Sequence, residues 1–192
     1  MAITLTKGGN ISLAKADPSL TKLVAGLGWK PRETDGPGFD LDASLFMLNK
    51  DGRVRSEADF IFYKQMTSPE GAIIHNGDNT SGASEGDVEQ VLIDLTKVPV
   101  DVETLRLVVT IYDAEKRKQT FGQVGGAFMR IVNEVSGAEV VRYDLFEDYS
   151  TETAMVFGEI YRNNGEWKVR AVGQGYAGGL DALCRQVGIN PV

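Results

Sequence analysis

Hydrophobic and polar residues alternate at every second position in several short stretches of this chain, which is the pattern of a half-buried β-strand. The alternation is clearest in residues 105–112, 141–145 and 167–171. Further strands are predicted for the stretches LDASLFML (41–48), ADFIFYK (58–64), QVLIDL (90–95) and TAMVFGEIYR (153–162). Because many short strands joined by turns are typical of a β-sandwich, we expect a mainly β fold with two antiparallel-rich sheets.

Helical patterns are few and short. Residues 114–121 predict one short helix. Near the end of the chain, apolar residues spaced i, i+3, i+4 and i+7 predict a closing helix over 180–187 that packs on the sandwich. Cys184 lies on the apolar face of this helix, so we expect a small core residue rather than a nucleophile. Because no repeat or linker interrupts the pattern, a single domain is expected over residues 1–192.

The composition is that of an ordinary globular domain, with 42% hydrophobic and 24% charged residues among 192. No apolar segment approaches the roughly 20 residues of a membrane span, and the N-terminal stretch lacks a signal-peptide core, so no membrane insertion is expected. One cysteine and one histidine exclude an internal disulfide framework and a zinc site built from Cys and His. A single cysteine also fits a reducing cytoplasm. The histidine, His75, is expected at the surface.

Charge is distributed unevenly. The chain has 27 acidic and 20 basic residues and a formal net charge of -7. Twelve of the acids lie in three windows without a base, residues 33–42, 78–89 and 144–152, which leaves 27 − 12 = 15 acids against 20 bases elsewhere. An acidic balance argues against binding of duplex nucleic acid through its phosphates. The three windows are therefore the first place to look for chemistry.

The first two windows have the composition of cation-binding loops. Asp40 and Asp42 open a predicted strand, where side chains two apart face the same way and would repel each other without a cation. Residues 77–89 supply carboxylates, an amide and hydroxyls among glycines, and such oxygen-only donor sets suit Ca²⁺. Neither window is an EF-hand, because Leu45 or Ala83 stands where that loop needs glycine. The alternative interpretation is that these acids simply form solvated turns.

Catalytic and nucleotide-binding patterns carry little weight in this chain. Residues 173–178 match G-x-G-x-x-G, but the following strand and acidic residue of a dinucleotide site are missing, so the glycines are interpreted as a tight connection. No obvious nucleophile or base accompanies the acidic windows, because the nearness of His75 to Asp78 and Ser81 in sequence does not by itself indicate a triad. A divalent-metal-dependent hydrolase that uses the same carboxylates is nevertheless kept as the alternative function. The third acidic window is interpreted mainly as turns and caps, with Asp148 and Glu152 as minor candidates.

Several ordered motifs resemble the TerD family, the tellurium-resistance and general stress proteins of bacteria. The resemblance begins with LTKGGNISL (5–13) and FDLDAS (39–44). It continues over essentially the whole chain through GDN (77–79), FGQV (121–124), GEIYR (158–162) and GQGY (173–176). The resemblance implies a β-sandwich that binds one or two Ca²⁺ through acidic loops, and a role in resistance to tellurite and other stresses.

Carried over position by position, the family's calcium loops fall on Asp35, Asp40, Asp42, Asp78, Asn79, Asp87 and Glu89. Val88 stands where family members often have a further aspartate, which bears on the number of ions bound. The expected function is a cytoplasmic, non-enzymatic, calcium-binding stress-response protein without catalytic or cofactor-binding residues. Other stress or tellurite-resistance proteins are its expected partners.

Overall fold

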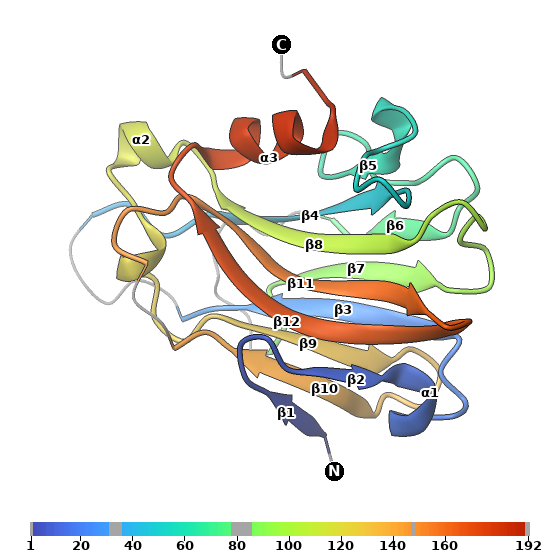
Figure 1. Cartoon of the computed structure of the whole chain (residues 1–192). Coiled ribbons are helices and arrows are strands. Elements are labelled where there is room, and N and C mark those ends of the chain that lie inside the picture. Colours follow the sequence, from blue (N-terminus) through green and yellow to red (C-terminus); the bar gives the residue numbers. More distant parts are fainter. Residues whose placement is uncertain (1, 31–35, 78–85, 147–148, 191–192) are drawn as a thin grey trace.

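Two six-stranded sheets form the computed structural model (Figure 1), which describes residues 2–30, 36–77, 86–146 and 149–190. The first sheet contains, in spatial order, β1 (Ile3–Leu5), β10 (Glu139–Asp144), β9 (Phe128–Asn133), β3 (Lys22–Gly28), β7 (Glu89–Asp94) and β6 (Ile73–His75). The second contains β2 (Asn10–Ser12), β12 (Glu166–Tyr176), β11 (Ala154–Asn163), β8 (Thr104–Ile111), β4 (Leu41–Leu48) and β5 (Phe60–Ile61). Among the paired strands of the described residues, β1 and β10 are parallel and the others antiparallel. The predicted mainly β fold with two antiparallel-rich sheets is confirmed.

The main core lies between the two sheets. Burial of every second residue along β7 and β9 places one face of each strand in this core. Phe157 of the second sheet and Tyr143 of the first are both fully buried, and their rings meet edge to face with centroids 5.8 Å apart. The alternation seen in the sequence therefore marks the residues that join the two layers.

A smaller core lies on the outer face of the second sheet, under helix α3 (Gly179–Val187). Its buried members are Phe46, Leu48, Phe60, Val108, Ala154, Val156, Leu183, Cys184, Val187 and Ile189. Gly188 adopts φ +94° and ends the helix, as a glycine can without strain. The predicted closing helix over 180–187 is thus confirmed, and Figure 1 shows it lying along one side of the sheet. None of the described helices has the length and apolar character needed to cross a membrane.

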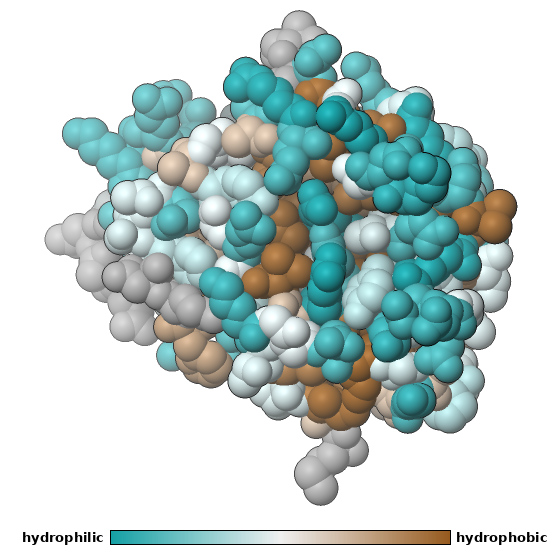
Figure 2. All heavy atoms as spheres, in the orientation of Figure 1, coloured by the Kyte–Doolittle hydropathy of each residue, from teal (hydrophilic) through white to brown (hydrophobic). Residues whose placement is uncertain are grey.

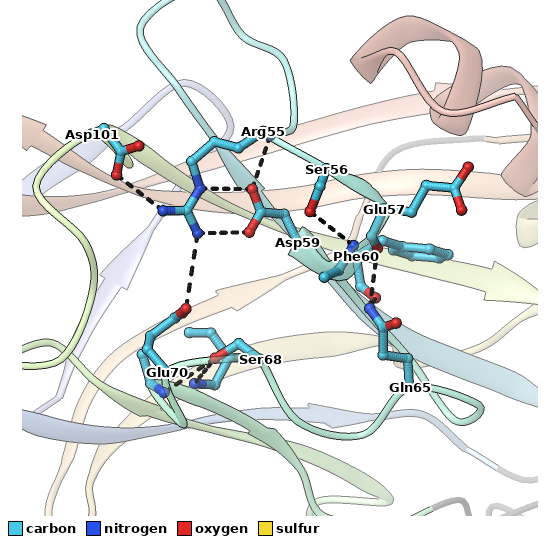
Figure 3. Close-up of polar contacts among 12 residues, drawn as sticks. Arg55, Ser56, Glu57, Asp59, Phe60, Gln65, Ser68, Glu70 and Asp101 are labelled. Atoms are coloured by element: carbon cyan, nitrogen blue, oxygen red, sulfur yellow. Dashed lines mark hydrogen bonds and ion pairs between the residues drawn. The ribbon is translucent and has the colours of Figure 1, made fainter.

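Polar side chains interrupt the strand that we predicted over residues 58–64. The chain forms a 3-10 turn, η1 (Glu57–Asp59), before the two residues of β5. This turn is stabilised by Asp59, whose buried carboxylate accepts hydrogen bonds from the backbone N–H of Arg55 (2.9 Å) and from its guanidinium (2.7 and 2.8 Å), as Figure 3 shows. Beyond β5, paired backbone hydrogen bonds between Phe62 and Gln65 close a turn. Local hydrogen bonds therefore outweigh the apolar pattern in this segment.

The predicted helix over 114–121 is also shorter than expected. Helix α2 spans Ala114–Arg117 and ends because Lys118 adopts a left-handed conformation, with φ +53°. A 3-10 turn, η2 (Phe121–Gln123), follows. Strands β1, β2, β3, β6 and β9 and the one-turn helix α1 (Leu13–Ala16) were not predicted, in part because three of these strands have only three residues.

Candidate functional site

Four of the seven predicted calcium ligands lie in the described residues, namely Asp40, Asp42, Asp87 and Glu89. The other three, Asp35, Asp78 and Asn79, lie outside them. Asp40 precedes β4 and Asp42 is its second residue, whereas Asp87 precedes β7 and Glu89 opens it. Strands β4 and β7 belong to different sheets, so the first question is whether the fold brings the two acidic segments together.

Glu89 connects the two acidic segments directly. Its carboxylate, 2% exposed, accepts a hydrogen bond from the backbone N–H of Ala43, the residue after Asp42. His75 of β6 completes the contact, because its Nε2 donates to the carbonyl oxygen of Ala43 at 3.0 Å and lies 3.9 Å from Glu89 Oε2. Side chains from the first sheet thus bind the backbone of β4 in the second sheet, and the starts of β4 and β7 are held at one edge of the sandwich.

His75 corrects an expectation from the sequence, which placed it at the surface. The side chain is 1% exposed and serves as a buried contact between the sheets. The apolar neighbours Ile73 and Ile74 are the sequence signal for this location, because they mark a strand whose alternate residues, Ile73 and His75, face inward. The buried position supports a structural role for the imidazole.

Asp40 is held by the segment that contains α2. Its carboxylate is 7% exposed and forms an ion pair with Arg117, whose Nη2 lies 3.3 Å from Asp40 Oδ2. The side-chain amide of Gln119 donates to the carbonyl oxygens of Pro37 (2.9 Å) and Gly38 (3.2 Å), which precede Asp40 in the chain. The short α2 segment therefore positions the approach to β4, and with it the first acidic segment.

Asp87 is held by an arginine of β9, which lies beyond β3 in the same sheet. Arg130 Nε donates to Asp87 Oδ1 at 2.7 Å, and this hydrogen bond is the main reason why the pKa of Arg130 is raised. The carboxylate also packs tightly on Gly26 of β3, where a Cβ atom would lie 2.3 Å from it. A larger residue at Gly26 would have to displace this carboxylate, so the sequence Gly26-Leu27-Gly28 is a signal for this close approach that the charge pattern alone could not provide.

The described acids do not assemble a metal cluster by themselves. Within residues 2–30, 36–77, 86–146 and 149–190, no group of three or more His, Cys, Asp or Glu side chains is arranged to hold an ion. In the third acidic window, Asp144 pairs with Arg142 at 2.8 Å, and Glu152 accepts a hydrogen bond from the backbone of Thr151 at 3.0 Å. Asp148 lies outside the described residues. Asp144 and Glu152 of the third window therefore make local contacts.

Cys184 is predicted to react slowly while the protein is folded. Burial of Cys184 on the inner face of α3 raises the pKa of its thiol to about 11, so the reactive thiolate is scarce at pH 8 and becomes abundant only above that pKa. We expect an aromatic disulfide reagent to modify the native protein at pH 8 on the order of 100-fold more slowly than the denaturant-unfolded chain. Equal rates in the two states, measured by the absorbance of the released thiol, would contradict a buried thiol.

Comparisons with known proteins agree with this architecture. A crystal structure of a homologue of telluride resistance protein (TerD) from Streptomyces coelicolor A3(2) superposes with a TM-score of 0.70 and covers 90% of this chain and 100% of the other, at 22% identity. At that identity the match concerns the fold alone. The tellurium resistance protein TerD of Serratia marcescens is 58% identical over 190 residues, covering 99% of each chain. General stress protein 16U of Bacillus subtilis (strain 168) is 50% identical over 98% of each chain. The sequence model of the TerD domain family matches residues 1–187, so the chain belongs to the TerD domain family.

Proposed function

We propose that this chain is a cytoplasmic, calcium-binding, non-enzymatic stress-response protein of the tellurite-resistance type. The names of its relatives, tellurium resistance protein and general stress protein, support the process in which it acts. The proposed ligands of one or two Ca²⁺ are Asp35, Asp40, Asp42, Asp78, Asn79, Asp87 and Glu89. With the ions bound, the loops present a surface to other stress or tellurite-resistance proteins.

The observation that carries this proposal is the hydrogen bond between Glu89 and the backbone of Ala43. It joins segment 36–42 to segment 86–89, although 46 positions separate the two residues. Carboxylate and carbonyl oxygens at one edge of the sandwich are the donor type that Ca²⁺ prefers. The described acids therefore offer the right chemistry, and the remaining ligands would come from the rest of the two windows.

The charges around these acids also favour a cation. Arg117 and Arg130 are single positive charges next to Asp40 and Asp87, and they offset only part of the acidity of the two windows. Two Ca²⁺ would change the formal net charge from -7 to -3, because each ion adds two positive charges. Binding should therefore reduce repulsion between carboxylates and stabilise the folded protein.

Calorimetric titration of chelator-treated protein with Ca²⁺ is the direct test. We expect one or two ions to bind, and binding at least about tenfold weaker in the variant Asp40→Asn/Asp42→Asn and in Asp87→Asn. At a calcium concentration 100 times the dissociation constant, one site should add about 2.7 kcal/mol to the free energy of unfolding. Asp51→Asn is the matched control, because Asp51 is an exposed turn aspartate that pairs with the neighbouring Lys50.

Two results would overturn the proposal. One is a melting curve that is identical in chelator and in millimolar calcium. The other is calcium binding that is the same in the natural protein and in the variants of Asp40, Asp42 and Asp87. Pull-downs with and without calcium then separate a calcium-dependent contact with partners from a purely structural ion.

A further inference from the structure

A groove of about 520 Å³ crosses the outer face of the second sheet, away from the two acidic segments. Strands β8, β11 and β12 form its floor, and α3 and the turn at Lys7–Gly8 border it. Its polar lining consists of Lys7, Arg106, Glu159, Arg170, Gln174, Tyr176 and Gln186. Figure 2 shows this face, with hydrophilic side chains running across its centre between hydrophobic ones. None of these charged residues belongs to the hydrophobic core under α3, so packing of that helix does not explain their presence.

Glu159 organises the charges in this groove. The residue is 3% exposed and lies directly opposite Arg106 on one neighbouring strand and Arg170 on the other. Its carboxylate accepts hydrogen bonds from Nε of Arg106 at 2.7 Å and from Nε of Arg170 at 2.8 Å. The Nη2 atom of Arg170 donates to it as well. One buried carboxylate thus fixes two guanidinium groups side by side.

Further contacts restrict the two arginines. Arg106 Nη1 donates to Gln186 Oε1 of α3 at 3.4 Å, and the guanidinium carbon of Arg170 lies 5.1 Å from the centre of the Tyr161 ring. Both side chains nevertheless line the groove, and 49% of the Arg170 side chain is exposed. A guanidinium offers five N–H donors, so each arginine has donors beyond those that Glu159 and Gln186 use. These donors are pre-positioned rather than mobile.

The groove carries more positive than negative charge. The lining contains three positively charged side chains, those of Lys7, Arg106 and Arg170, and one carboxylate. It therefore has a surplus of two positive charges. This surplus is unusual for a protein whose formal net charge is -7. Two fixed guanidinium forks and a lysine are the arrangement that binds an oxyanion, because planar donors match its oxygens in pairs.

We propose that this groove binds a small, multiply charged oxyanion of the phosphate class. Arg106 and Arg170 donate to its oxygens, and Glu159 positions both arginines without touching the anion. Lys7, whose Nζ also donates to the hydroxyl of Tyr149 at 3.3 Å, adds a third positive charge at the mouth of the groove. This site is separate from the proposed calcium ligands and does not depend on them.

The test is calorimetric titration of chelator-treated, dialysed protein with inorganic phosphate in a zwitterionic buffer at constant ionic strength. We expect saturable binding that is about tenfold weaker in Arg170→Gln and about threefold weaker in Lys7→Gln, because each variant removes one positive charge from the groove. Lys7 has no hydrogen bond to Glu159, so its variant tests the site even if loss of an arginine disturbs the fold. Arg142→Gln is the matched control, since Arg142 pairs with Asp144 in the first sheet.

Tellurite is a second source of the same oxyanion chemistry, and the names of the relatives justify a parallel titration with it. Binding of either anion that weakens in both groove variants and not in Arg142→Gln supports the site, and the tighter anion identifies the source. Absence of saturable binding for both anions overturns the proposal, as does binding that the groove variants leave unchanged. Because calcium is absent throughout, these outcomes are independent of the calcium titration.

Discussion

Replacement of Asp59 by alanine is expected to lower the free energy of unfolding by about 3–5 kcal/mol, because it leaves Arg55 without its buried partner. The Asp59 side chain is 2% exposed and binds Arg55 through one backbone and two guanidinium hydrogen bonds. These hydrogen bonds are the main reason why the pKa of Arg55 lies above its usual range. Denaturant unfolding of the natural protein and the variant measures the effect.

The same arginine provides the control. Asp101 also contacts Arg55 (Figure 3), at 3.0 Å, but its side chain is 61% exposed. Because solvent screens such a pair, Asp101→Ala should cost less than about 1 kcal/mol. Equal costs for Asp59→Ala and Asp101→Ala would show that burial does not decide the strength of these contacts.

Phe157→Ala should also lower the free energy of unfolding by about 3–5 kcal/mol, because it opens a cavity between the two sheets. Phe157 is fully buried, and its ring packs edge to face against Tyr143 of the opposite sheet. Removal of the ring therefore takes away both apolar contact and an aromatic pair that links the layers. Thermal and denaturant unfolding measure the loss.

Phe146→Ala is the matched substitution at the surface. The Phe146 side chain is 86% exposed, so its removal should change the free energy of unfolding by no more than about 0.5 kcal/mol in either direction. A Phe157→Ala variant as stable as Phe146→Ala would contradict the placement of Phe157 in the core.

Strand positions were predicted best for the longer strands, and the prediction over 41–48 corresponds to the bounds of β4. The predictions over 105–112, 141–145 and 153–162 correspond to β8, β10 and β11, because one face of each of these strands is buried along most of its length. Short strands such as β1 and β6, with three residues each, contain too few positions for an alternation to be recognised. Their place in the sheet depends on neighbours that are distant in the chain.

Composition and resemblance predicted the ligands of the candidate calcium site. They did not predict the contacts that these residues make. The acidic windows are visible in the sequence, whereas the partner of Asp40 is 77 positions away and that of Asp87 is 43 positions away. Nothing local in the sequence links Arg117 to Asp40 or Arg130 to Asp87. Sheet pairing creates these contacts, and so it also creates the local charge balance of the site.

Strand β11 illustrates most clearly the difference between what the sequence predicts and what the tertiary structure decides. The apolar stretch at residues 153–162 predicts a strand, and the TerD motifs predict the family of the chain. Strict alternation would place Phe157 and Glu159 on the same face. The register with β8 shifts between Val156 and Gly158, so that Phe157 is an extra residue and the face changes after it.

This bulge turns Phe157 into the core and Glu159 toward Arg106 and Arg170 on the outer face. The sequence by itself thus determined the β class, the family, the closing helix and the acidic windows, because periodicity, ordered motifs and composition are local properties of the chain. Only the tertiary structure decided that Glu89 and His75 bind the backbone of Ala43, and that Glu159 lies between two arginines. Those contacts depend on sheet register and on a bulge, which arise from packing between strands that are far apart in the chain.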